Sequence, residues 1–139
     1  MEDFDYKITD IYGHYTLGHK GNIVYVKGIG AWDEKGPQNL FQDFPKVIEA
    51  MDAEQWAFIV DLREWDLATP EALDMWPSFQ ERLVEGGLKC MAMVYEESFL
   101  KTHLTQKYVS DELIPIDMFT CEQDALVWCQ TILTTLKED

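Results

Sequence analysis

Residues 56–98 read WAFIVDLREWDLATPEALDMWPSFQERLVEGGLKCMAMVYEES, and this stretch decides the fold. It begins with an apolar run, Ala57–Leu62, and ends with a second one, Cys90–Tyr95. Short, continuous apolar runs are typical of strands that are covered on both faces. Between the two runs, apolar residues recur at helical spacing. The stretch therefore predicts strand, helix, strand.

The central helix has recognisable ends in the sequence. Thr69 suits the N-cap, Pro70 suits the first helical position, and Gly86-Gly87 suit a left-handed stop. A parallel strand pair joined by a helical crossover is the economical interpretation. The strand that carries Asp61 is then expected inside one mixed sheet, with helices on both faces.

The remaining segments extend this unit in both directions. Residues 1–13 predict either an N-terminal arm or a short extra element, and residues 14–139 predict a single domain. We expect a hairpin (strands 15–17 and 23–30), a helix over 37–51, a helix over 98–109, a strand over 115–119 and a helix after Thr120. Pro45 and Pro77 lie inside helical patterns, so each marks a curve or a later helix start; we favour the curve. The predicted class is α/β: an N-terminal β-hairpin, then βαβαβα units, with a mixed, mostly parallel sheet flanked by helices.

Composition excludes several functional classes. The chain has 139 residues, 47% of them hydrophobic, and a net charge of −15. This charge repels phosphates, so we expect neither nucleic acid nor an anionic membrane surface as a partner. The acidic N-terminus lacks the pattern of a secretory signal, and we expect a cytoplasmic protein. Three cysteines without a C-x-x-C pair predict reduced thiols.

The order of these elements, together with specific residues, resembles the STAS domain, and more closely its SpoIIAA-like branch of stand-alone bacterial proteins. The residues that carry the resemblance are GIGAW at the hairpin end (28–32), FIVDL (58–62), ALDMWPSFQERL (72–83), Glu85-Gly86-Gly87 and FTCEQDALVW (119–128). The resemblance covers nearly the whole chain from about residue 14. It implies a non-enzymatic module that regulates by binding another protein.

One departure from this family concerns its regulatory switch. Anti-sigma antagonists of the family carry an Asp-Ser-Ser-Gly run before the central helix, and a kinase phosphorylates its serine. The corresponding stretch here is Thr69-Pro70-Glu71-Ala72, which holds no serine. Thr69 is the nearest hydroxyl, and its ordinary role is to cap the helix, so we expect no phosphorylation switch.

The candidate binding residues are aromatic. Trp32, Trp65 and Phe99 each follow a predicted strand, and Trp76 lies on the central helix. If the sheet is mainly parallel, the residues that follow its strands converge on its carboxyl edge. They then either line an apolar pocket or partner-binding patch, or they seal the end of the core. Trp128, on the last helix, is expected to pack against the core.

Catalytic chemistry has weaker support in the sequence. The candidates are carboxylates near strand ends, Asp61, Asp66 and Glu96-Glu97. His14, His19 and His103 show no metal-ligand spacing, and no nucleophile or phosphate-binding motif is present. We therefore predict no catalytic residue, cofactor or metal. Three hypotheses follow: a module that binds another protein or a second copy of itself, a carrier of a small lipophilic ligand and, third, an enzyme that uses the strand-end carboxylates.

Overall fold

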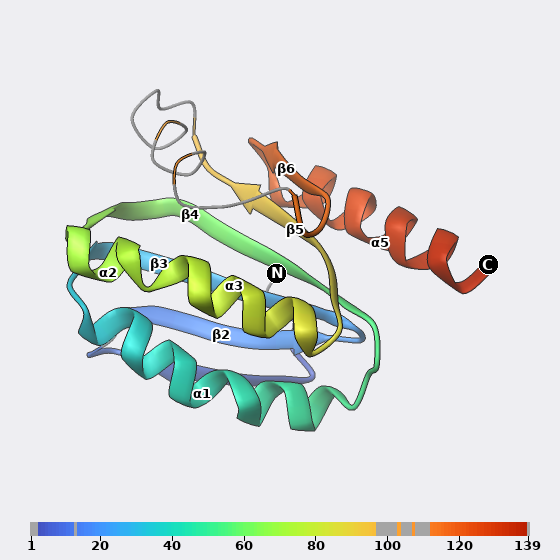
Figure 1. Cartoon of the computed structure of the whole chain (residues 1–139), viewed down its shortest axis with the longest axis horizontal. Coiled ribbons are helices and arrows are strands. Elements are labelled where there is room, and N and C mark those ends of the chain that lie inside the picture. Colours follow the sequence, from blue (N-terminus) through green and yellow to red (C-terminus); the bar gives the residue numbers. More distant parts are fainter. Residues whose placement is uncertain (1–2, 13, 97–102, 104–106, 108–111, 139) are drawn as a thin grey trace.

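A computed structural model describes residues 3–12, 14–96, 103, 107 and 112–138 of the chain (Figure 1). The strands are β1 (Tyr6–Asp10), β2 (Tyr15–Lys20), β3 (Ile23–Trp32), β4 (Trp56–Ala68), β5 (Leu88–Val94) and β6 (Ile116–Phe119). The helices are α1 (Lys35–Met51), α2 (Pro70–Asp74), α3 (Trp76–Glu85) and α5 (Glu122–Glu138). No helix of these ranges is long and apolar enough to cross a bilayer.

The six strands form one sheet in the order β1-β2-β3-β4-β5-β6. β1, β2 and β3 pair antiparallel, and β3, β4, β5 and β6 pair parallel. The prediction of a mixed, mostly parallel sheet with an interior β4 is confirmed. Of the two alternatives for the N-terminus, the structure has the extra element, because residues 6–10 form the edge strand β1.

Different helices cover the two faces of β4. Phe58 and Val60 belong to a larger apolar cluster with residues of α1 and α3. Ala57 and Ile59 point the other way, into a smaller cluster with residues of α5. Figure 1 shows α1, α2 and α3 together on one side of the sheet, with α5 apart from them. This alternation is the period of two that a strand covered on both faces requires.

The central helix differs from the prediction, because it is two helices that meet at Met75. The ring nitrogen of Pro77 cannot donate a hydrogen bond to the preceding turn, so a continuous helix would lose a bond there. Instead α3 starts at Trp76 and holds Pro77 in its first turn, where a donor is not needed. The curve favoured for Pro77 was wrong, whereas α1 does continue through Pro45.

Most of the other predicted elements agree with the structure to within a few residues, but β4 continues to Ala68, six residues past its predicted end at Leu62. Trp65 and Asp66 therefore lie inside this strand, whereas the sequence placed them after it. The hairpin turns at Gly21-Asn22, and β6 lies within the expected range 115–119. Of the helix expected over 98–109, the structure describes only His103 and Lys107; the rest lies outside the described residues.

Candidate functional site

Three of the four predicted aromatic residues line one cavity. Trp32 ends β3, Trp65 lies near the end of β4, and Trp76 begins α3; all three border a cavity of about 90 Å³. The cavity lies at the carboxyl edge of β3 and β4, and α2 supplies part of its wall. Figure 1 shows α2 at the left. Phe99 lies outside the described residues, so its place in this site stays a prediction.

The rest of the cavity wall is apolar and comes from both layers. The sheet supplies Val26, Gly28, Val60, Leu62, Ala68 and Met93, and the helices supply Pro37, Leu40, Ala72 and Leu73. No side chain in this wall carries an oxygen atom. Sequence reasoning missed this aliphatic lining, because nothing in a periodic apolar pattern distinguishes a residue that borders a cavity from one that packs solid.

Trp65 reaches the cavity through an irregularity in β4. Asp61 faces α5, and strict alternation would place Trp65, four residues later, on that same face. The pairing of β3 with β4 shifts register between Lys27 and Ile29 and again between Gly30 and Ala31. These shifts act as β-bulges and reverse the alternation of side chains at the end of β4. The Trp65 side chain therefore belongs to the apolar cluster on the α1 side of the sheet. Gly28 and Gly30 lie at these two shifts, as glycines inside a strand often do.

Two glycines make room for the tryptophan rings. A Cβ atom on Gly36 would lie 2.7 Å from Trp32 Cε3, so only glycine lets α1 approach this ring. A Cβ atom on Gly28 would lie 3.3 Å from Trp65 Cδ1 and 3.5 Å from Trp32 Cζ2. The absence of a side chain at Gly28 therefore lets both rings lie close to its backbone.

Hydrogen bonds fix one indole of the cavity and leave another without a partner. Trp32 Nε1 donates to the carbonyl oxygen of His14 over 3.1 Å. Trp76 Nε1 is buried and has no hydrogen-bond partner. The Trp76 ring contacts Phe58 and Phe79, with ring centroids 6.5 and 5.5 Å away. A buried N–H group without a partner is rare and calls for an explanation.

The volume limits what the cavity can hold. A cavity of about 150 Å³ binds benzene, and drug-sized ligands occupy about 300–1,000 Å³. The 90 Å³ here fit a branched group of a few carbon atoms. A more open hollow of about 390 Å³ lies between α1 and α3, but it includes only Glu49 and Arg82 as charged residues and none of the predicted site residues.

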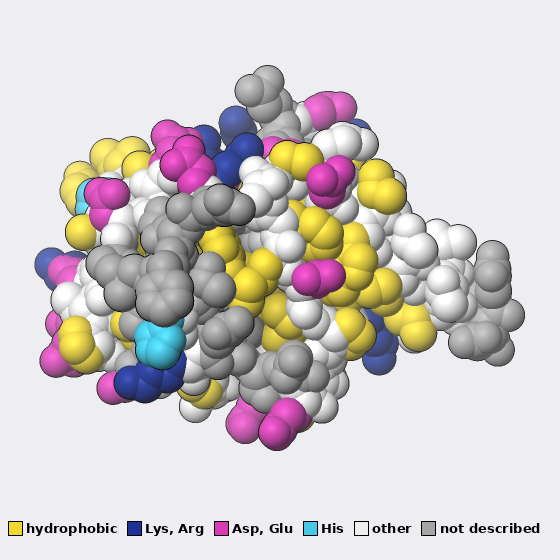
Figure 2. Space-filling view, turned by 90° about the horizontal axis from the view of Figure 1, so that it is seen from above, with side chains coloured by type: hydrophobic (Ala, Val, Ile, Leu, Met, Phe, Trp, Pro, Cys, Tyr) yellow, Lys and Arg dark blue, Asp and Glu magenta, His cyan; other side chains and the backbone are white. Residues whose placement is uncertain are grey.

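The surroundings of the cavity are acidic and, on one side, apolar. Residues within two positions of the cavity wall in the sequence include five exposed carboxylates: Asp33, Glu34, Asp66, Glu71 and Asp74. Near Trp32, the turn between β1 and β2 exposes Ile11 (71%) and Tyr12 (80%), and Ile29 of β3 is 42% exposed. Backbone Ile29 N–H donates to His14 O over 2.9 Å, which holds this turn beside the end of β3. We call the exposed pair Ile11 and Tyr12 the apolar patch. Figure 2 shows acidic side chains spread over another face as well.

Asp61 is buried, and both oxygens of its carboxylate accept hydrogen bonds. Its carboxylate accepts hydrogen bonds from the Tyr25 hydroxyl (2.5 Å), from Arg63 Nη2 (2.7 Å) and Nε (3.0 Å), and from the Arg63 backbone N–H (3.1 Å). Burial alone would raise the pKa of Asp61, but the hydrogen bonds from Arg63 and Tyr25 outweigh it, and the pKa lies below its ordinary value. Arg63 also lies 3.5 Å from Glu122 at the start of α5. Asp61 thus links β3, β4 and α5.

The other predicted carboxylates do not assemble into a site. Asp66 and Glu96 are exposed, and Glu97 lies outside the described residues. Within the described ranges, no group of three or more His, Cys, Asp and Glu side chains is arranged to hold a metal ion. Thr69 accepts a hydrogen bond from the Ala72 N–H (3.3 Å), which confirms its role as the cap of α2.

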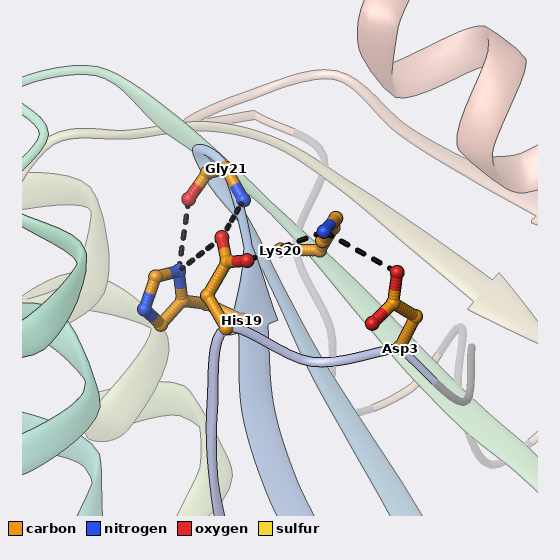
Figure 3. A network of polar contacts seen from close by, with 5 residues as sticks. Asp3, His19, Lys20 and Gly21 are labelled. Atoms are coloured by element: carbon orange, nitrogen blue, oxygen red, sulfur yellow. Dashed lines mark hydrogen bonds and ion pairs between the residues drawn. The ribbon is translucent and has the colours of Figure 1, made fainter.

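The histidines and cysteines have local, structural contacts. His14 is exposed; His19 is buried, and its Nδ1 lies 2.9 Å from the Gly21 carbonyl oxygen (Figure 3). Beside it, Lys20 binds Asp3 and Asp5 and so fastens the N-terminal segment to the hairpin turn. Cys90 and Cys129 are buried between β5 and α5, and the hydrogen bond with Cys90, followed by burial, raises the pKa of the Cys129 thiol. Trp128 packs against Phe119, as predicted.

Comparison with known proteins identifies the fold. The sequence matches no protein family and no curated protein. Among solved structures, it is similar to an uncharacterised protein of the DUF3478 family with a SpoIIAA-like fold from Shewanella loihica PV-4, with a TM-score of 0.57, 12% identity and coverage of 83% of this chain and 91% of the other.

Two structures of SpoIIAA itself are similar as well. The unphosphorylated anti-sigma factor antagonist SpoIIAA gives a TM-score of 0.60 at 12% identity, over 85% of this chain and 99% of the other. The phosphorylated form of the Bacillus cell fate determinant SpoIIAA gives 0.56 at 13% identity, over 82% and 97%. The chain therefore has the SpoIIAA-like fold.

Proposed function

We propose that this protein is a non-enzymatic regulatory module that binds another protein through the carboxyl edge of its sheet, without a phosphorylated serine. The observation that carries the proposal is the apolar patch beside Trp32. Single exposed apolar residues are common, but Ile11 and Tyr12 are adjacent and more than two-thirds exposed. The SpoIIAA-like fold supports the proposal, because SpoIIAA is an anti-sigma factor antagonist.

The charge of the same edge indicates the chemistry of the partner. The exposed carboxylates around the cavity favour a partner surface with Lys or Arg at its rim and an apolar side chain at its centre. Self-association is the less favoured form of this binding, because two copies would bring carboxylates together.

The test is affinity capture from an extract of the source organism, combined with sedimentation of the purified protein. We expect the wild type to capture a partner and a variant with Ile11→Ser and Tyr12→Ser to capture at least tenfold less of it. Val127→Ser is the matched control, because Val127 is 51% exposed on α5. A protein that stays a solitary monomer and captures nothing would contradict the proposal.

A second candidate function is binding of a small lipophilic ligand in the cavity itself. The observation that favours it is the apolar wall with its three tryptophan rings. The volume restricts the buried part to a branched end, such as that of an isoprenoid, with the remainder outside.

Tryptophan fluorescence titrations with isoprenoids and fatty acids test this second function. We expect a change for at least one branched ligand, and we expect Gly28→Ala to weaken it, because the added methyl group enters the space between Trp32 and Trp65. Trp128→Phe is the control, since Trp128 packs with Phe119 outside the cavity wall. Fluorescence that no ligand changes would argue against a ligand pocket.

Enzymatic activity has the least support of the three hypotheses. The Asp61 carboxylate is bound to Arg63 and Tyr25, and Asp66 and Glu96 face solvent without a shared cleft among the described hollows. A pair of carboxylates with separated pKa values, as acid–base catalysis needs, is not assembled from these three.

A further inference from the structure

Four half-buried residues form the mouth of the cavity. Of the 13 residues in its wall, Trp32, Ala68, Leu73 and Trp76 are partly exposed, and the other nine are buried. Trp32 and Ala68 pair with each other at the ends of β3 and β4. Leu73 lies on α2, and Trp76 begins α3. The cavity therefore reaches the surface between the carboxyl edge of the sheet and the junction of α2 with α3.

The charges around this mouth are of one sign. The five exposed carboxylates named above all lie within two positions of a mouth residue in the sequence, and no Lys, Arg or His does. The nearest basic residue along the chain is Lys35, three positions after Trp32. An acidic rim around an apolar opening favours a partner that brings cations and an apolar group to the same place.

We propose that the cavity is the anchor pocket of the protein-binding surface, and that it takes the side chain of a Leu or Ile flanked by Lys or Arg in the partner. This inference rests on the protein-binding function proposed above and specifies the segment of the partner that is bound. It assigns the cavity to that partner instead of to a free lipophilic ligand.

The volume determines which side chain fits. Benzene, with six carbon atoms, occupies a cavity of about 150 Å³, so four carbon atoms need about 100 Å³ in proportion. The cavity of about 90 Å³ matches the four-carbon side chain of Leu or Ile and is too small for the ring of Phe, Tyr or Trp. No side chain of the wall carries a charge that could pair with an ionised group of the partner, so the anchor is apolar.

A side chain held by a partner gains more from this cavity than a free molecule of the same size. The affinity of a small molecule is limited by its number of atoms. An anchor residue in a protein interface adds its burial to the contacts that surround it. Such contacts are available here, because Trp32 Nε1 and the Ile29 backbone N–H both donate to His14 O and keep the apolar patch beside the mouth.

The experiment uses acetylated and amidated peptides of the form Lys-Lys-X-Lys-Lys, in which X is Leu, Ala or Phe; Glu-Glu-Leu-Glu-Glu tests the charge. Each peptide is titrated into the ¹⁵N-labelled protein, and the indole N–H signals of Trp32 and Trp65 are followed by NMR. Trp32→Phe and Trp65→Phe assign these signals. Ala68→Val narrows the cavity. Ala31→Val is the matched control, because Ala31 is exposed on the neighbouring strand and lies outside the wall.

We expect the Leu peptide to bind at least tenfold more tightly than the Ala peptide, because three more carbon atoms leave water. The Phe peptide and the Glu peptide should each bind at least tenfold more weakly than the Leu peptide. Ala68→Val should remove the preference for Leu over Ala, whereas Ala31→Val should keep it. Leu73→Ala removes three carbon atoms from the wall and should strengthen binding of the Phe peptide, a gain that a poorly folded variant cannot show.

The possible results distinguish this inference from the function on which it rests. If the Leu, Ala and Phe peptides bind alike, if Ala68→Val keeps the preference for Leu, or if no peptide at millimolar concentration moves either indole signal, the anchor inference is wrong. If the Glu peptide binds as well as its Lys counterpart, the claim of flanking cations is wrong. The protein-binding function is tested separately, by the loss of partner capture in the variant with Ile11→Ser and Tyr12→Ser.

Discussion

Replacing Asp61 with alanine should destabilise the fold more than any other single change in its network. Asp61 has no exposed surface, and its loss leaves the Tyr25 hydroxyl and the Arg63 guanidinium without their acceptor. Removal of one partner from a buried ion pair costs about 3–5 kcal/mol. The Arg63 side chain is 34% exposed and lies 3.5 Å from Glu122, so part of its charge stays solvated and paired. We therefore expect the low end, about 3 kcal/mol.

A second variant measures how much of this free energy comes from the hydrogen bond between Tyr25 and Asp61. Tyr25→Phe removes one hydrogen bond to a charged acceptor and should cost about 1.5 kcal/mol. In the double variant the two losses should not add, since each single change already breaks the same bond; we expect about 3 kcal/mol in total. Urea unfolding, followed by circular dichroism and tryptophan fluorescence, measures all three from the shift in midpoint at constant slope.

The pH dependence gives the sign of the electrostatic part. The pKa of Asp61 in the folded protein lies below the ordinary value of 3.8, so its stabilisation is present above that pH. As the pH falls through the folded pKa, the carboxylate is protonated and the difference between wild type and Asp61→Ala should shrink. A cost below 1 kcal/mol at pH 7, additive losses in the double variant, or a difference that grows in acid would refute this account.

Three further predictions follow from the backbone, the thiols and the tyrosines. Gly87→Ala should unfold the protein or lower its stability by several kcal/mol, because φ is +113° and the new Cβ would lie 2.1 Å from the Glu54 carbonyl oxygen; thermal unfolding measures it. A thiol reagent should modify Cys121 in the native protein, whereas Cys90 and Cys129 should react only after denaturation; mass spectrometry of the labelled peptides decides between these states. Burial and then the hydrogen bonds to Asp43 and Asp61 raise the pKa of Tyr15 and Tyr25, so the stability that they contribute is complete below about pH 10 and is lost above it; ultraviolet titration should show both tyrosines ionising only as the protein unfolds.

The convergence of Trp32, Trp65 and Trp76 could be predicted because it depends on topology. Residues that follow parallel strands meet at one edge, whatever the details of packing. The orientation of Trp65 toward the cavity could not be predicted. It depends on bulges in the pairing of β3 with β4, and such bulges are not visible in the sequence of one strand. The volume of the cavity could not be predicted either. It depends on small packing gaps between apolar residues, and the sequence pattern assigns all of these residues to the core.

Two local features left signals in the sequence. Asp61 and Arg63 are two residues apart on a strand, so they share a face, and their ion pair is compatible with this spacing although it was not predicted. Pro77 marked the start of a new helix, but the apolar spacing continued across the break and favoured one long helix. The edge strand β1, by contrast, is half polar and mostly exposed, and only its pairing with β2 makes it a strand.

A single carbonyl oxygen joins the interior of this edge to its surface. His14 O accepts from the Trp32 indole and from the Ile29 backbone N–H, and His14 itself is held at a φ of 58°, which few residues other than glycine adopt. Whatever displaces the Trp32 ring must break this bond or pull the turn that presents Ile11 and Tyr12. His14 O therefore couples the cavity to the surface. A ligand that moves the Trp32 ring would also change how the turn presents Ile11 and Tyr12 to a bound partner.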